Sequence, residues 1–186
     1  MTTYIALLRG INVGGNNKVK MVELKEMLVE RGFENPKTLL QSGNVVFQSS
    51  TESREELEDR LEEATKEKFE IAPAYYIRTL KEWDDVIAAN PFEQMAKDDP
   101  SHLMVAFLRD PPDAEELAKV ASAIQGPEKL EAGTEHIYIT YPDDIGHSKV
   151  DRTPGWKNLF GKSTARNWNT VLKLAELAKQ VCGSRQ

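Results

Sequence analysis

The sequence predicts an α+β protein made of two similar halves, each on a split β-α-β plan, followed by a C-terminal helical extension. The first half alternates short strand patterns with longer helical patterns in the order β-α-β-β-α-β. Residues 4–9 match residues 104–109 at an offset of 100, with Ala and Arg identical in both runs. A last amphipathic pattern over residues 170–181 predicts the helical extension.

The elements of the first half are bounded by residues that favour turns or end helices. Short apolar runs predict strands at residues 3–8, 38–40, 45–47 and 74–77. Amphipathic patterns predict helices at residues 21–31, 52–69 and 79–90. We expect Gly32 to end the first helix, and Gly43 with Asn44 to supply the hairpin turn. The second helix has three candidate caps: Ser50, Thr51 and Ser53.

The second half follows the first in element order as far as its hairpin. Its expected strands are residues 102–109, 128–132 and 136–141, with a helix at residues 114–124. A match of six residues alone can arise by chance, but the shared order favours an internal repeat. A polar stretch at residues 98–101 separates the halves. We therefore predict an N-terminal half at residues 1–97 and a C-terminal half with its helical tail at residues 98–186.

The composition is that of an ordinary globular chain, with 40% apolar and 29% charged residues. The single cysteine, Cys182, cannot form an internal disulfide. No apolar run approaches the roughly 20 residues that span a bilayer, and residues 1–9 lack the pattern of an export signal. We therefore expect a cytoplasmic protein that does not associate with membranes.

The net charge of −6 is unevenly distributed along the chain. Residues 1–20 hold three basic and no acidic groups, and residues 147–186 hold eight basic and two acidic groups. The stretch between them holds 13 basic and 28 acidic groups. The net charge argues against a general nucleic-acid binder. If the fold brings the two ends together, however, a local basic patch can attract an anion.

The segment GINVGGNNK, residues 10–18, lies between a predicted strand and helix, where glycines let backbone amides approach a phosphate. Gly10 and Gly15 have the spacing of a P-loop, but two asparagines stand where Lys and Ser or Thr are required. Two interpretations remain open. The segment is a tight loop, or it is an anion site to which Arg9 or Lys18 supplies the charge.

The other reactive side chains fit no catalytic or metal template. Ser42 lacks the G-x-S-x-G pattern and is expected in a hairpin turn. Three histidines lie in separate segments without metal-binding spacing: His102, His136 and His147. Four helix carboxylates are expected on the exposed side of their helix, where they serve solvation: Glu55, Glu56, Glu58 and Glu62. We predict neither a metal nor a cofactor.

The basic tail holds a second set of candidate ligand groups. Ser148 and Lys149 are followed by STARNWNT, residues 163–170, directly before the last helix. Hydroxyls, amides and a guanidinium in this position can hold a phosphate or carboxylate at the positive end of a helix. The same residues can instead cap the helix, with Trp156 and Trp168 as core anchors.

Several sequence blocks are specific when taken together: ALLRGINVGG (6–15), LQSGNVVF (40–47), NPF (90–92), GHSK (146–149) and TARNWNTV (164–171). They resemble the bacterial domain-of-unknown-function family 1697, and the resemblance spans nearly the whole chain. It implies two ferredoxin-like halves and brings no established reaction, cofactor or catalytic residue. Lys20 stands where many members carry proline, which changes only how the loop enters its helix.

Our leading hypothesis is a binding module for a phosphate-bearing or other anionic ligand, such as a nucleotide or an RNA. The candidate charged groups are Arg9, Lys18, Lys149 and Arg166. The candidate amides and hydroxyls are Gly14, Gly15, Ser42, Asn44 and Thr164. One alternative is an enzyme acting on a nucleotide or phosphoester through Ser42 or His147. Another is an interaction protein or self-associating scaffold, and the sequence leaves the oligomeric state open.

Overall fold

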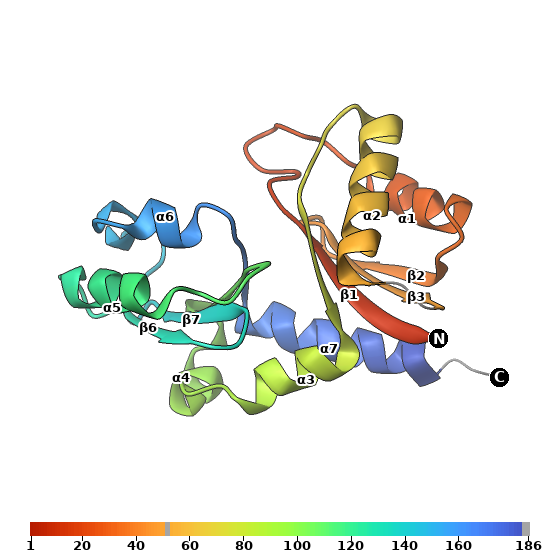
Figure 1. The fold of residues 1–186 in the computed structure, drawn as a ribbon. Helices are drawn as coiled ribbons and strands as arrows, with labels where there is room; N and C mark the ends of the chain where they lie inside the picture. Colours follow the sequence, from red (N-terminus) through yellow and green to blue (C-terminus); the bar gives the residue numbers. More distant parts are fainter. Residues whose placement is uncertain (51–52, 184–186) are drawn as a thin grey trace. The chain divides into compact units, whose positions relative to one another are not determined.

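Two four-stranded antiparallel sheets and their helices form the α+β fold (Figure 1). The structure is a computed structural model, and it describes residues 1–50 and 53–183. The chain divides into two compact units, Met1–Asp85 with Lys173–Gln186, and Val86–Leu172. Helices α3 (Leu80–Ala88) and α7 (Trp168–Gly183) each begin in one unit and end in the other. The predicted division between residues 97 and 98 stays a prediction.

The N-terminal unit contains the first sheet, whose strand order is β2-β3-β1-β4. Its strands are β1 (Thr2–Leu8), β2 (Glu34–Leu39), β3 (Asn44–Ser49) and β4 (Tyr75–Thr79). Its other helices are α1 (Met21–Glu30) and α2 (Arg54–Phe69). In the register of the sheet, Ile5 of β1 lies between Val46 of β3 and Arg78 of β4.

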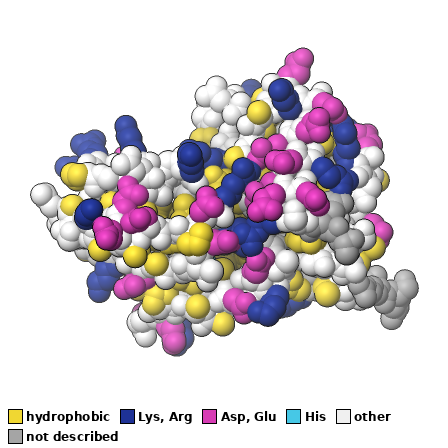
Figure 2. Space-filling view, in the orientation of Figure 1, with side chains coloured by type: hydrophobic (Ala, Val, Ile, Leu, Met, Phe, Trp, Pro, Cys, Tyr) yellow, Lys and Arg dark blue, Asp and Glu magenta, His cyan; other side chains and the backbone are white. Residues whose placement is uncertain are grey.

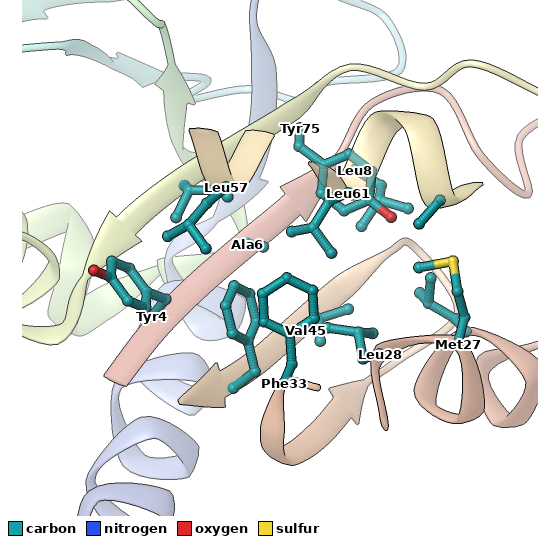
Figure 3. Close-up of a cluster of buried hydrophobic side chains, with 14 of the residues drawn as sticks. Tyr4, Ala6, Leu8, Met27, Leu28, Phe33, Val45, Leu57, Leu61 and Tyr75 are labelled. Atoms are coloured by element: carbon teal, nitrogen blue, oxygen red, sulfur yellow. The ribbon is translucent and has the colours of Figure 1, made fainter. Parts of the chain in front are cut away.

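One face of this sheet packs against α1 and α2 (Figure 3). Because side chains alternate along a strand, Tyr4, Ala6 and Leu8 all point to this face. The helices contribute buried leucines and methionines, including Leu24, Met27, Leu28, Leu57 and Leu61. These contacts position the segments that join β1 to α1 and β2 to β3, where the candidate site lies.

The start of α2 and the end of α1 follow the expected capping rules. Ser53 caps α2, since its side chain accepts a hydrogen bond from the backbone N–H of Glu56 while the Glu56 carboxylate reaches back to the Ser53 N–H. Gly32, with φ of 81°, ends α1 as predicted. The predicted helix start at residue 52 and the alternative cap Thr51 lie outside the described residues.

Three glutamates accept hydrogen bonds along the outer edge of β4. Two of them, Glu58 and Glu62, were expected to be exposed. The outward N–H groups of Tyr75 and Ile77 donate to Glu62 Oε1 at 3.1 Å and Glu58 Oε1 at 3.2 Å, both on α2. The next outward N–H, that of Thr79, donates to Glu82 of α3 at 2.7 Å. The expectation that Glu58 and Glu62 lie on the exposed side of α2 is therefore wrong, and Glu58 is only 4% exposed. Glu58 and Glu62 are four residues apart, so they lie on the same face of α2, and this face is directed to the edge of β4 rather than to solvent.

The second unit contains a sheet with strand order β6-β7-β5-β8. Its strands are β5 (Leu103–Phe107), β6 (Lys129–Ala132), β7 (His136–Thr140) and β8 (Thr164–Asn167). Its helices are α4 (Glu93–Asp98), α5 (Ala114–Ala123) and α6 (Trp156–Phe160), with short 3-10 turns at Pro100–His102 and Val150–Arg152. One face of the sheet packs on α5 and α6 through Ala106, Ile137, Ile139, Val120 and Leu159.

Three short elements of this unit were not expected from the sequence. They are α4, α6 and β8, and the last two lie between the predicted strand at residues 136–141 and the predicted helix at residues 170–181, where the sequence analysis placed no element. Asn167 closes β8 and also caps α7, since its Oδ1 accepts from the N–H of Thr170 at 3.0 Å. Trp168 is buried, as its predicted role of core anchor requires.

Candidate functional site

The first loop is a tight reversal of the chain held by its own backbone. The N–H of Asn12 donates to the carbonyl of Asn17 at 3.1 Å, and the N–H of Asn16 donates to the carbonyl of Val13 at 3.0 Å. Gly14 and Gly15 are the two residues between Val13 and Asn16, with φ of 58° and 82°. Such a two-residue turn requires positive φ at both central positions, which explains the paired glycines.

The Asn12 side chain joins this loop to the β2–β3 turn. Its Nδ2 donates to the carbonyls of Val19 at 2.9 Å and Gln41 at 2.7 Å, and its Oδ1 accepts from the N–H of Val19 at 2.9 Å. Asn17 adds a bond from its Nδ2 to the carbonyl of Gly10 at 3.0 Å. Two blocks that lie 29 residues apart in sequence are thereby fixed to one another.

The β2–β3 turn packs closely against the same loop. The N–H of Leu8 donates to the carbonyl of Gly43 at 2.8 Å. A Cβ added at Gly43 would lie 2.8 Å from Leu8 Cβ and Ile11 Cδ1, so no other residue fits without displacing them. Asn44 is buried and donates to the carbonyl of Leu39 at 2.9 Å and to Ser42 Oγ at 3.0 Å. It begins β3, whereas the sequence predicted it as a turn residue.

We call residues 9–18 together with residues 40–43 the loop–turn surface. Arg9, Gly14, Gly15, Lys18 and Ser42, all predicted site residues, are exposed on it. In the described residues, neither Arg9 nor Lys18 forms a side-chain ion pair. No acidic residue occurs in residues 1–20 or in residues 35–50. The surface therefore carries positive charge without a neutralising carboxylate from its own segments.

The charges on α1 and α2 are arranged differently. Acidic and basic side chains are interspersed over this region of the molecule (Figure 2). Several pair with one another, as Lys68 of α2 does with Glu30 of α1 at 2.9 Å. The helices thus differ from the loop–turn surface in carrying carboxylates beside their basic groups.

The remaining predicted site residues lie in the second unit. Arg166 is 8% exposed, and its Nη1 donates to Thr164 Oγ1 and to the carbonyl of Ala165, both at 2.8 Å. Burial lowers the pKa of Arg166 to about 10, so the guanidinium keeps its charge at neutral pH. Thr164 is also buried. That these residues share a site with Arg9 stays a prediction.

Lys149, by contrast, lines a pocket formed within the second unit alone. The pocket has a volume of about 550 Å³ and lies between residues 123–128, which join α5 to β6, and residues of the segment 143–154. At its wall, Ser148 Oγ donates to a carboxylate oxygen of Glu128 and accepts from the N–H of Val150 at 3.2 Å. Three residues of the GHSK block, His147, Ser148 and Lys149, therefore form part of the wall of a cavity.

A histidine–aspartate cluster that sequence reasoning missed forms part of the wall of this pocket through Asp144 and His147. Asp144 pairs with His147, and its Oδ1 lies 4.0 Å from His102 Nε2. Hydrogen bonds from the N–H of Gly146 and from His147 lower the pKa of Asp144 below its ordinary value. His102 Nδ1 lies 2.5 Å from Asp99, whose pKa is lowered by hydrogen bonds from Ser101 and His102. The signal in the sequence is an Asp-x-x-His spacing that occurs twice.

Neither a metal site nor a membrane span emerges from the parts of the chain that are described. No group of three or more His, Cys, Asp or Glu side chains in residues 1–50 and 53–183 could hold a metal ion. Each helix in these residues is too short or too polar to cross a membrane.

Comparison with known proteins gives the chain a family and a structural neighbour. A solved structure of a conserved bacterial protein from Streptococcus pneumoniae is similar, with 24% sequence identity and a TM-score of 0.74, over 95% of this chain and 98% of that one. At that identity the likeness shows the fold alone. Among curated proteins, none matches this chain. Residues 1–138 match the family described as "Protein of unknown function (DUF1697)". The chain therefore belongs to the DUF1697 family.

Proposed function

We propose that this protein is a binding module for a phosphate-bearing or other anionic ligand, such as a nucleotide or an RNA, held on the loop–turn surface. The observation that carries the proposal is the Asn12 bridge, which fixes Arg9 and Lys18 beside the Ser42 turn in a region with no carboxylate of its own. A rigid arrangement lowers the entropy cost of binding. Exposed amides of Gly14 and Gly15 add donors for phosphate oxygens.

The finer fold description is also a proposal, namely that the two units are ferredoxin-like and related by an internal repeat. Support comes from the equivalent strand orders, β2-β3-β1-β4 and β6-β7-β5-β8. Arg78 in β4 and Arg166 in β8 also occupy equivalent register positions, and each donates to the carbonyl of the preceding residue. A cytoplasmic location likewise remains a prediction.

The test is the melting temperature of the chain with nucleotides, sugar phosphates, pyrophosphate and short RNAs. A ligand that binds only the folded state at 100 times its Kd stabilises by about 2.7 kcal/mol, which raises the melting temperature by several degrees. The double variant Arg9→Gln/Lys18→Gln should abolish the shift. The matched variant Lys25→Gln/Lys173→Gln, which removes two other exposed charges, should keep it.

If an RNA binds, its affinity measured at rising salt gives an independent readout. Each lost phosphate contact should reduce the slope of log K against log salt by about 0.7 for a single strand, so the double variant should lose about 1.4. A panel in which no ligand shifts the melting temperature would contradict the proposal. So would a ligand that stabilises the double variant as strongly as the unchanged chain.

A further inference from the structure

The pocket in the second unit has the size and lining of a small-molecule site. Its volume of about 550 Å³ lies within the range of roughly 300–1,000 Å³ that such sites occupy. Apolar side chains, including Ile124, Pro127, Val150 and Pro154, share the lining with a few charged groups. All lining residues belong to the second unit, so the pocket is complete within it.

The acidic groups of the pocket are largely engaged, whereas its basic groups are not. Glu128 accepts from the Ser148 hydroxyl, and Asp144 is held by His147 and by the N–H of Gly146 at 3.1 Å. Lys149 and Arg152 line the pocket and form no side-chain ion pair with any described residue. Two cations are therefore available to a ligand in a cavity where two of the three lining carboxylates, Glu128 and Asp144, already have partners.

We infer that this pocket binds a small organic acid, with its single anionic group held by Lys149 and Arg152 and its apolar body against Ile124 and Val150. A guanidinium and an ammonium suit either a carboxylate or a phosphate monoester. A highly charged ligand such as a nucleoside triphosphate fits poorly, because Asp143, Asp144 and Glu128 also line the cavity.

This site is separate from the loop–turn surface and does not depend on the proposed function. It lies in the other compact unit and uses none of the residues of that surface. The two proposals can therefore fail independently, and variants in one unit serve as controls for the other.

The experiment titrates the full chain, labelled with ¹⁵N, with benzoate and with phenyl phosphate as probes. Binding should shift the amide resonances of Gly126, Ser148 and Val150, which lie at the pocket wall. The variant Lys149→Gln/Arg152→Gln should weaken binding at least tenfold. The exchange Lys149→Arg/Arg152→Lys, which keeps both charges, should retain most of the affinity. The matched variant Lys157→Gln/Lys162→Gln, outside the lining, should bind as the unchanged chain does.

The two probes distinguish a carboxylate ligand from a phosphate ligand, and binding of either one supports the inference. The variant Arg9→Gln/Lys18→Gln should bind both probes normally, even if it loses the ligand of the loop–turn surface. If neither benzoate nor phenyl phosphate shifts the amide resonances of the pocket, the inference is overturned. Equal affinity in the Lys149→Gln/Arg152→Gln variant, with an unchanged melting temperature showing that it is folded, would also overturn it.

Discussion

Leu40 has a backbone conformation that bulky side chains avoid. Its φ is 59°, and its side chain is 53% exposed, so burial offers little compensation for the strain. A left-handed conformation costs an ordinary residue roughly 1–2 kcal/mol, whereas Asn and Gly adopt it more readily. Leu40 begins the turn that Asn12 holds in place, within the loop–turn surface.

Replacing Leu40 with a residue that tolerates positive φ should stabilise the protein. We expect Leu40→Asn to raise the free energy of unfolding by about 0.5–1 kcal/mol, because it relieves part of the backbone strain. Chemical denaturation measured by circular dichroism would give this value.

Gly43→Ala provides the opposite case, since Gly43 has φ of 76° and its added Cβ would meet Leu8 and Ile11. It should destabilise by more than 1 kcal/mol. For the Leu40→Asn variant, a lower free energy of unfolding would contradict the prediction. It would mean that contacts of the Leu40 side chain outweigh the strain of its backbone.

The composition of the first loop was enough to predict a loop, with a tight turn as one of two interpretations, but not the role of Asn12. Gly and Asn tolerate left-handed conformations, so a run of them predicts a loop from local chemistry alone. The Asn12 side chain, however, bonds to Gln41, 29 residues away. Such a contact depends on how β1 and β3 pair, which the loop sequence does not contain.

At the level of elements, the protection of β4 is the feature with the clearest energetic consequence. An edge strand presents unpaired N–H groups that can recruit another strand. Here Glu62, Glu58 and Glu82 accept from three successive outward N–H groups. Burial alone would raise the pKa of Glu82, but hydrogen bonds from Thr79 and the nearby Arg54 guanidinium lower it. Glu82 therefore stays ionised at neutral pH.

Glu58 allows a test of this arrangement by two substitutions, one of which removes the hydrogen-bond acceptor while the other keeps it. Glu58→Leu leaves the buried N–H of Ile77 without its carboxylate and should cost about 1–3 kcal/mol. Glu58→Gln keeps an acceptor oxygen at the same distance from the backbone and should cost less. The readout is the free energy of unfolding of both variants. Equal losses would mean that the hydrogen bond to Ile77 contributes little.

Element prediction from the sequence succeeded where periodicity was regular and failed where pairing alone defines an element. The helices α1, α2 and α5 have the apolar spacing that makes them recognisable. Strand β8, with the sequence TARN, has no apolar alternation and buries Thr164 and Arg166. It is a strand because it pairs with β5, about 60 residues earlier in the chain. No local pattern could have revealed it.

At the scale of the whole molecule, helices α3 and α7 each contribute residues to both compact units. Each helix has its first part in one unit and its last part in the other. Within the N-terminal unit, Lys179 of α7 pairs with Asp84 of α3 at 2.9 Å. Leu174, Ala178 and Val181 of α7 are buried. The N-terminal unit thus includes α7 residues from Lys173 on, which are distant in sequence from Met1–Asp85.

A fragment of residues 1–97, the predicted N-terminal half, should therefore be much less stable than the full chain. It lacks the α7 residues from Lys173 on, which belong to the N-terminal unit. Losing the burial of even a few leucine-sized side chains costs several kcal/mol, a large fraction of typical domain stability. We expect the fragment to melt at a clearly lower temperature by circular dichroism, or to lack a cooperative transition.

The matched comparison is the same fragment joined through a flexible linker to residues 168–183. Restoring the α7 segment should recover cooperative unfolding, because the linker returns the missing side chains without the second sheet. A linked fragment in which Ala178, which is fully buried, is replaced by Asp should lose the gain. If residues 1–97 alone unfold as cooperatively as the linked form, the boundary between residues 97 and 98 describes the folding units better than the one at Asp85.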